Sequence, residues 1–524
     1  MGSRGPARRH TVRARTGIRL WPVGTVLALI FTAALAVSGT VFWTLAGLLG
    51  VQGLAPETRL TSRTLFDLVK LSFGVVAGSG ALVALVVAYR RQRIDEDGAH
   101  RETVRLHTER FTTAVSQLGD PSTAVRLGGV HALAGLADDA PTDALRQTCV
   151  DVLCAYLRLP YAPDPGDGDQ EARREHLALR EVRHTVIRLI RDHLRLPTDH
   201  PHSWRGYDFD LTGTVLDGGD WSGAHFSGGE VSFAGATFCG GKVSFAQTHF
   251  SGSRVSFLDA RFTGGEVDFS GARFSEALVL LGAEFSGGEV SFGAAEFCGG
   301  DVSFLGAQFS GSQVRFGGSR FTGGHVTFLQ PRFTGGEVSF ARAEFSGGRV
   351  AFHHARFENG EVSFAYAVFS AGAVSFTGAR FCGSAVSFRD ARFAGGQVLL
   401  TGAEFAGGLV SFARAEISGG EISFTGAEFA DGRLSFAEAT LCGGQLGFFA
   451  AKFAGRGVGV ADVVLAHASL RRGTLSFTGA EFLGSRFSFD HAQRYRDVEV
   501  ELLGASGRVP GELRAWASRP GSAD

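Results

Sequence analysis

A twelve-residue repeat fills more than half of this chain and limits what it can fold into. The stretch FSGGEVSFAGATF at 226–238 is followed at once by a near copy, FCGGKVSFAQTHF at 238–250. Bulky apolar residues, mostly Phe, recur at alternating intervals of seven and five residues, with Val or Ala two places before most of them. Self-similarity at a fixed period indicates a solenoid, in which each repeat buries its apolar face only by stacking on its neighbours.

The amino-acid composition favours a dry aromatic core. The 524 residues include 74 Gly and 46 Phe but only 6 Tyr and 1 Met. Phe without Tyr indicates rings used for packing, since no hydroxyl needs a partner, and abundant Gly indicates tight turns or close backbone approach. Gly-rich disorder is the alternative, but disordered chains are poor in aromatic residues. The formal net charge of −1 makes the chain neither a polyanion nor a polycation.

The start of the repeat region carries a recognisable five-residue unit. FDLTG, TVLDG, GDWSG and AHFSG follow one another from 209, with centres Leu211, Leu216, Trp221 and Phe226. This resembles the pentapeptide-repeat family, in which each unit A-x-[L/F]-x-x builds one side of a coil. The resemblance implies a mainly β fold, a right-handed four-sided parallel β-helix, over 207–492. The two extra residues in alternate units depart from the family's pattern.

The length of one coil follows from the space that Phe rings need. A twelve-residue coil would have two faces and an interior too thin for stacked rings, whereas a 24-residue coil has four faces. We therefore predict about twelve coils in a rod of roughly 55–60 Å, at about 4.8 Å per coil. The Gly-Gly pairs are predicted to round the two longer corners with positive φ.

The repeat is irregular at three places. A residue is missing near Leu280, and an extra five-residue unit is predicted at 468–470. After Phe489 the pattern stops, so 493–524 is predicted to be a cap, with YRDVEVE at 495–501 over the last coil, followed by a flexible tail at 502–524.

The N-terminal region predicts two membrane spans. Residues 1–20 form a basic head with six Arg and no acid, and 21–49 carries no charge. A second apolar run leads to a predicted span at 68–89, and both are long enough to cross a bilayer. Ala34-Leu35-Ala36 resembles a signal-peptide cleavage site, but the apolar run continues well past it. A buried helical hairpin in a soluble protein is the other alternative.

Flanking charges predict the orientation of these spans. Arg90, Arg91 and Arg93 follow the second span, while the intervening loop at 50–67 holds only Arg59 and Arg63. By the positive-inside rule the loop is extracytoplasmic. We therefore expect a two-pass protein of the inner (plasma) membrane with both termini in the cytoplasm.

Residues 98–198 lack the repeat and predict a helical connector between membrane and solenoid. Apolar residues at helical spacing predict helices at 101–118, 124–136, 143–159 and 171–196, with a Pro- and Gly-rich linker at 160–169. The Arg-rich helix at 171–196 is expected to have a solvated face near anionic lipid. Nucleic-acid binding by the same face is the less favoured alternative.

The cysteines do not predict a metal site or a disulfide framework. Four of them share one repeat position, just after the central residue, and stand 59, 84 and 60 residues apart: Cys239, Cys298, Cys382 and Cys442. That separation fits neither zinc nor disulfide geometry, so we interpret them as small substitutes for Ser. Cys149 and Cys154 are predicted to be reduced residues of a helix core.

No other residue predicts catalysis or a cofactor. The closest His pairs, His200 with His202 and His353 with His354, lack Cys or carboxylate partners at metal-ligand spacing. The Gly-Gly pairs are not followed by the Lys-[Ser/Thr] of a phosphate loop. The serine of each VSF, as in Ser232, is repeated in a column, whereas a nucleophile is a single residue beside a base. We therefore predict no catalytic, metal or cofactor-binding residues.

Four functions remain to be compared. We favour a membrane-anchored cytoplasmic scaffold that binds an unidentified protein partner. Some pentapeptide-repeat proteins mimic duplex DNA and protect a type II topoisomerase, but those rods are strongly acidic and soluble. Here residues 207–492 hold 27 acids against 20 bases. An enzyme is not expected without a unique polar constellation, and an extracellular rod requires the opposite topology. The lipid bilayer is an expected partner and nucleic acid is not.

Overall fold

The structure is a computed structural model in two compact units, Met1–Leu106 and His107–Asp524, and each unit is considered by itself. It describes residues 23–48, 62–162, 164–252, 254–275, 278–280, 282–454, 461–519 and 521. The predicted basic head at 1–20 lies outside the described residues.

The first unit consists of two long apolar helices. α1 spans Val23–Leu48 and α2 begins at Ser62. Windows at Phe31–Leu48 and Ser62–Asp95 are long and apolar enough to cross a membrane, by length and composition. Large apolar side chains such as Trp43 are exposed on them. Both helices are therefore candidate membrane spans.

α2 is longer than the sequence indicates and runs from Ser62 to Leu118 without a break. The end of the predicted 50–67 loop is thus helical, and the rest of that loop lies outside the described residues. Residues 90–100 contain no Pro and one Gly, Gly98, so nothing strongly opposes helix there. One helix therefore covers both the predicted second span and the first predicted helix of the connector.

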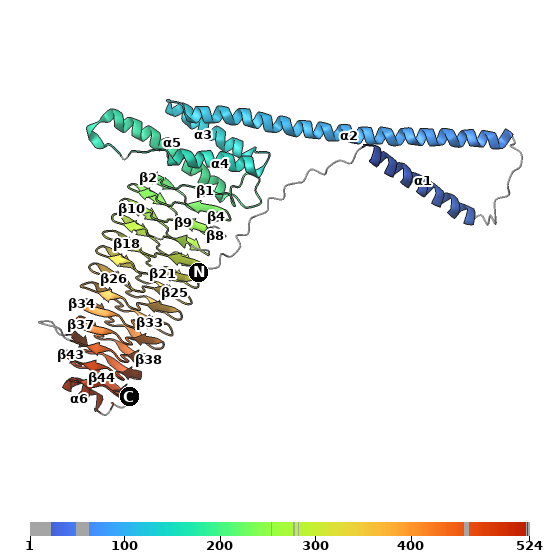
Figure 1. The fold of residues 1–524 in the computed structure, drawn as a ribbon. Helices are drawn as coiled ribbons and strands as arrows, with labels where there is room; N and C mark the ends of the chain where they lie inside the picture. The colour runs from blue at the N-terminus through green and yellow to red at the C-terminus, as the bar shows by residue number, and fades with distance from the viewer. Residues whose placement is uncertain are drawn as a thin grey trace. The chain divides into compact units, whose positions relative to one another are not determined.

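A small helical domain opens the second unit (Figure 1). The end of α2 packs with α3 (Thr123–Asp138), α4 (Asp143–Arg158) and α5 (Gln170–Arg195) around one apolar core. A short 3-10 helix, η1 (Gly166–Gly168), lies in the linker. The Thr142 side chain caps α4 by accepting a hydrogen bond from the backbone N–H of Leu145, which satisfies one of the helix's open donors.

The rest of the unit is a parallel β-solenoid. The first coil contains β1 (Phe209–Asp210), β2 (Val215–Leu216), β3 (Gly219–Asp220) and β4 (His225–Ser227). The second contains β5 (Glu230–Ser232), β6 (Thr237–Phe238), β7 (Lys242–Ser244) and β8 (His249–Ser251). Each of the first four strands pairs with the strand four places later. The solenoid is therefore four-sided, and we number its faces 1 to 4 after β1 to β4.

The predicted fold class and coil length are confirmed. Glu230 pairs with Arg254, twenty-four residues on. Near the missing residue the offset is one shorter, since Phe262 pairs with Phe285. The stack continues for about 12 turns (Figure 1).

The four faces form two sheets. Faces 1 and 4 make a 22-stranded sheet, here called sheet A, and faces 2 and 3 make a 23-stranded sheet, sheet B. The Gly pairs lie between the two faces of each sheet. In β34 (Glu404–Ser411) and β37 (Glu428–Ser435) a single strand runs through both faces of sheet B. Tight turns join the sheets, as where the Ala236 N–H donates to the Phe233 carbonyl at 3.0 Å.

Columns of stacked rings fill the interior. Phe292 and Phe316 on face 3 stack with centroids 4.8 Å apart and planes 4° apart. Because neighbouring strands lie about 4.8 Å apart, the backbone spacing sets the ring spacing. Phe316 also meets Phe328 of face 1 edge-on, at 6.3 Å and 84°, and all three rings are fully buried. The two sheets therefore share one core.

The Gly-Gly corners need glycine for two reasons. Gly336 has φ +80°, and a Cβ there would lie 2.3 Å from the Ser312 carbonyl oxygen of the preceding coil. Positive φ favours glycine, and the close approach excludes any side chain. This confirms the predicted role of glycine at such positions.

The tight turns also use positive φ but often without glycine, as at Tyr366 and Arg414, which the sequence did not predict.

The extra five residues lie elsewhere than predicted. Leu470 stands opposite Leu441 in an ordinary register, so 468–470 is not an insertion. The additional residues lie between Phe453, on face 2, and Asp462, on face 3 of the same coil. Residues 455–460 of that segment lie outside the described residues.

The C-terminal region is more ordered than the predicted tail. β44 (Gln493–Glu501) pairs in parallel with β41 (Ser469–Ser476), and β45 (Ser506–Gly507) pairs with β42 (Glu481–Phe482). Stacking thus continues past 492. Residues 502–519 are not a flexible tail, because they contain β45 and then the helix α6 (Gly511–Ala517).

α6 closes the open end of the core. Leu513 and Trp516 are buried, and the Trp516 ring stacks on Phe489 at 4.6 Å. Arg494 takes the core position opposite Leu470 and donates to the Ala517 carbonyl at 2.6 Å. A charged side chain at a core position ends the stack, and two apolar side chains cover the last exposed rings.

Candidate functional site

The repeated serines cap turns. The Ser232 hydroxyl accepts a hydrogen bond from the Ala234 N–H at 3.4 Å, and Ser244 accepts from Ala246 in the same way. Ser and Thr commonly bond backbone groups two residues away at turns. The VSF serine therefore has a structural role in these tight turns.

Four cysteines occupy a position that small hydroxyl side chains share. The Cys239 thiol donates to the Leu216 carbonyl at 3.7 Å, and Cys298 donates to Phe274 at 3.5 Å. At the matching position the Ser275 hydroxyl donates to the Phe250 carbonyl at 3.2 Å. The interpretation of these cysteines as substitutes for Ser agrees with this geometry. Cys382, at the same position, is exposed.

The two helical cysteines are buried as expected. Burial raises the pKa of Cys149 to about 11 and that of Cys154 to about 12. Both thiols are therefore protonated at neutral pH, and a protonated thiol is a poor nucleophile.

The histidine pairs do not form a metal centre. The His200 and His202 rings meet edge-on at 5.4 Å, and His353 Nε2 lies 3.1 Å from the Ser375 hydroxyl. Within the described part of the chain, no group of three His, Cys, Asp or Glu residues is placed to hold a metal ion.

Sequence analysis missed a polar cluster where α5 meets the first coil. Asp217 follows the central Leu216, in the position that Cys239 takes one coil later. The Tyr161 hydroxyl donates a hydrogen bond to the Asp217 carboxylate at 2.6 Å, and Arg180 Nε lies 3.2 Å from the same carboxylate. His184 Nε2 approaches the other oxygen at 3.4 Å. No local sequence pattern indicates this grouping, because its members come from the linker, the helix and the solenoid.

This cluster holds a charged carboxylate in a half-buried place. Burial alone would raise the pKa of Asp217, but hydrogen bonds from His184 and Tyr161 and the charge of Arg180 lower it to about 2. Burial and the bond to Asp217 raise the pKa of Tyr161. Buried Arg183 donates to the carbonyls of Leu157 and Val215, which ties α4, α5 and the solenoid together. The cluster therefore fixes the helical domain onto the N-terminal end of the core.

A second cluster acts at the same junction. Trp204 is fully buried and stacks on His193 at 4.0 Å. Asp138 accepts from Trp204 Nε1 at 3.3 Å and lies 3.1 Å from His193 Nε2. Burial alone would lower the pKa of His193, but its bonds to Asp138 and to the Leu189 carbonyl raise it. α5 thus places several of its polar residues at this junction, while others, such as Arg174 and Arg188, are exposed.

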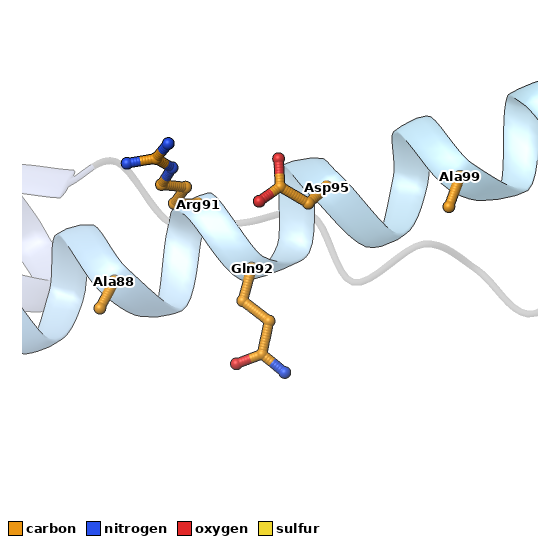
Figure 2. A pocket seen from close by; sticks show the side chains of 5 residues that line it. All are labelled: Ala88, Arg91, Gln92, Asp95 and Ala99. Atoms are coloured by element: carbon orange, nitrogen blue, oxygen red, sulfur yellow. The ribbon is translucent and has the colours of Figure 1, made fainter.

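A hollow on α2 offers little to a ligand. Figure 2 shows its lining residues, Ala88, Arg91, Gln92, Asp95 and Ala99, all on one helix. Arg91 and Asp95 project from one side and Gln92 from the other. Side chains of a single helix that diverge in this way do not enclose a site.

A groove on the solenoid has more definite chemistry. Gln330, Arg332, His354, Arg356, Gly378 and Arg380 line it, at the turn between face 1 of sheet A and face 2 of sheet B. Arg332 pairs in register with Arg356, and Arg356 with Arg380. Like charges directly opposite each other are unfavourable in a sheet. This basic row is an unusual feature of the outer surface.

The outer row of face 4, by contrast, alternates in sign from Arg273 to Glu344. Arg320 lies 3.0 Å from Glu296 in the coil before and 3.5 Å from Glu344 in the coil after. Asp390 accepts two hydrogen bonds from Arg414, at 2.7 and 2.6 Å. Exposed pairs of this kind contribute about 0–1 kcal/mol each. Since the interior is apolar throughout, the outer charges are where this solenoid differs from coil to coil.

Comparison with known proteins agrees with the repeat and the fold. Residues 269–320 match the family described as pentapeptide repeats (9 copies). Searches of curated proteins and of solved structures found no match. The matched segment lies in the N-terminal half of the solenoid and includes the place near Leu280 where the pairing offset is one residue shorter. Residues 269–320 thus carry pentapeptide repeats, and this match and the β-solenoid together support a pentapeptide-repeat protein.

Proposed function

We propose that this protein is a membrane-anchored scaffold whose solenoid lies on the cytoplasmic side and binds a protein partner without catalysis. The observation that carries the proposal is the combination of two exposed apolar helices with a rod whose interior is filled by side chains. The helices supply the anchor, and the filled interior leaves the outer faces for binding. Long repeat surfaces of this kind are commonly used to bind other proteins.

The flanking charges support the cytoplasmic side. Arg90, Arg91 and Arg93 follow the apolar part of α2, and the loop before it is poor in basic residues. This distribution favours retention of residues 90 onward on the cytoplasmic side. The scaffold and the two termini would then share one compartment.

The outer charges disfavour mimicry of duplex DNA. A DNA mimic needs carboxylates in a near-continuous array like that of the phosphates. Here 20 basic residues are mixed with 27 acidic ones over 207–492, and three Arg stand in consecutive coils at 332, 356 and 380. A protein partner suits this mixed surface better.

Cysteine labelling in intact cells tests the proposal. One variant carries a single Cys in the 51–60 segment, and a second carries a single Cys at the exposed Ser518, both with the native cysteines replaced by Ser. A membrane-impermeant maleimide should label the first variant but not the second until the cells are opened. Extraction of the chain by alkaline carbonate would overturn the anchor. Labelling of the Ser518 position in intact cells would overturn the cytoplasmic rod and favour an extracellular one.

A further inference from the structure

The two sheets of the solenoid carry different charge patterns on their outer faces. On each coil of sheet B, two outward residues flank the Gly pair. One stands just before the central residue of face 2, and the other is the first residue of face 3. We call these the face-2 row and the face-3 row. The face-2 row is Thr237, Arg261, Glu284, Gln308, Arg332, Arg356, Arg380, Glu404, Glu428, Lys452 and Glu481. The face-3 row is Lys242, Glu266, Glu289, Gln313, Glu337, Glu361, Ala385, Leu409, Arg433, Asp462 and Arg486.

Within a coil, the two rows tend to carry opposite charges. Six coils combine an acid with a base: Arg261/Glu266, Arg332/Glu337, Arg356/Glu361, Glu428/Arg433, Lys452/Asp462 and Glu481/Arg486. One coil combines like charges, Glu284/Glu289. The sign also changes along the rod. Face 2 is basic in the middle coils, whereas near the C-terminal end face 3 carries Arg433 and Arg486 with Asp462 between them.

Sheet A lacks this pattern at the equivalent positions of faces 4 and 1. One described coil combines opposite charges, Glu344/Arg349. Two combine like charges, Glu296/Asp301 and Glu416/Glu421. Both sheets contain Gly pairs at their centres, so the backbone does not explain the difference. The complementary charge pattern is a property of sheet B.

The opposite charges of one coil do not satisfy each other. Arg332 lies in β22 (Arg332–Phe333) and Glu337 opens β23 (Glu337–Ser339), with the Gly-Gly corner between them, and no ion pair joins these two described side chains. In the described part of the chain, Arg356, Glu337 and Glu361 form no ion pair. The middle of sheet B therefore presents a basic row and an acidic row, one on either side of the Gly-Gly corners.

Such a face is complementary to a second copy of itself. A two-fold axis parallel to the rod exchanges the two rows, so the face-2 row of one copy meets the face-3 row of the other. Closed two-fold symmetry also keeps the coils in register, so that the opposite charges of each of the six coils face one another across the two copies. In an antiparallel pair of copies, each row would face the same row of the other copy. With the two-fold axis at Arg356, for example, Arg332 of one copy would face Arg380 of the other.

We infer that sheet B is the contact face of a parallel, in-register dimer of this chain. Single exposed ion pairs are weak, but copies held in one membrane meet at high local concentration, so a modest interface suffices. The inference depends on the proposed membrane anchor only because the anchor raises the local concentration of the copies. The charge pattern itself stands without the anchor.

A native cysteine reports on this interface. Cys382 is exposed on sheet B and lies between the two rows, close to the expected two-fold axis. In a full-length chain with Cys382 as its single cysteine, a short bismaleimide should link two copies in isolated membranes. Ser370 is also exposed and takes the equivalent position on sheet A. Ser370→Cys on a cysteine-free background is the matched control, and it should crosslink at least about fivefold less if the interface is isologous through sheet B.

Charge reversal provides the second test. Arg332→Glu with Arg356→Glu makes both middle rows acidic, and Glu337→Arg with Glu361→Arg makes both basic. Each double variant alone should lose about tenfold or more of its Cys382 crosslinking, because like charges now meet across the interface. When the two variants are coexpressed with different tags, crosslinking between them should return. Arg320→Glu with Arg349→Glu on sheet A makes the same charge change and should leave Cys382 crosslinking unchanged.

Three results would overturn the inference. These are equal crosslinking at Cys382 and at Ser370→Cys, insensitivity of Cys382 crosslinking to reversal on sheet B, and failure of the two reversed variants to restore it together. Failure of the anchor is distinguishable. A chain that carbonate extracts but that still crosslinks through Cys382 overturns the proposed membrane location and leaves the dimer in place.

Discussion

Sheet A and sheet B are built on the same interior but carry different exteriors. Phe304 on face 1 and Phe316 on face 3 are both fully buried, and their rings meet at 6.3 Å. Outside, sheet B combines opposite charges across its centre in six coils, whereas sheet A does so in one described coil. The repeat must conserve its buried and turn positions to stack, but its outward positions are free to vary. A difference between the two exteriors is therefore informative about function.

Core truncation should have the largest effect and should not distinguish the sheets. Phe304→Ala and Phe316→Ala each remove a fully buried ring from a shared core. We expect each to lower the free energy of unfolding by about 3–5 kcal/mol, measured by chemical denaturation of the full chain in detergent. A loss confined to one sheet would show that the two sheets do not share a core.

The Gly-Gly corners should also be equally sensitive in both sheets. Gly336→Ala on sheet B and Gly324→Ala on sheet A each place a Cβ 2.3 Å from a carbonyl oxygen, at φ +80° and +70°. We expect each to cost about 2–4 kcal/mol, since the backbone must move as well as tolerate positive φ. Gly318→Ala is the control, because φ is +66° but no atom lies within 4 Å, and about 1 kcal/mol is expected there. Equal losses at all three positions would contradict the close-approach argument.

As the pH falls, the N-terminal end of sheet B should lose stability before the N-terminal end of sheet A. Asp217 lies on face 2, and its pKa falls from 3.8 to about 2 in the folded chain. A carboxyl group whose pKa is lowered on folding stabilises the folded chain at pH values above its unfolded pKa. For Asp217 this stabilisation is about 2 kcal/mol, and it is lost as the pH falls from about 4 to about 2. Asp217→Asn should remove that pH dependence in thermal unfolding scans. Ser227→Ala, at the matching position on face 4, should leave it intact.

Single charge reversals should have the smallest effect on folding. Arg356→Glu on sheet B and Arg392→Glu on sheet A alter exposed side chains, and each should change the free energy of unfolding by less than about 1 kcal/mol. Thermal unfolding would measure both. A large loss for Arg356→Glu would mean that the row serves folding rather than association.

The sequence predicted the regular part of this molecule well. The alternation of five and seven residues sufficed for the four-sided coil, because Phe233, Phe245 and their equivalents must all point inward. It did not predict the non-glycine residues at positive φ, such as Tyr366, since only tertiary pairing compels that conformation. The ends were harder still. Trp516 covers the core, and Asp217 joins Tyr161, through contacts between distant segments that no local pattern encodes.

Inter-copy distances between spin labels would test the central comparison most directly. The full chain in lipid nanodiscs would carry one label, either at Cys382 on sheet B or at Ser370→Cys on sheet A. We predict a short, well-defined distance between the two copies for Cys382. For Ser370→Cys we predict a distance longer by about 20 Å, twice the sheet spacing of about 10 Å. Equal distances from the two positions, or a shorter one from sheet A, would contradict the assignment of sheet B as the association face.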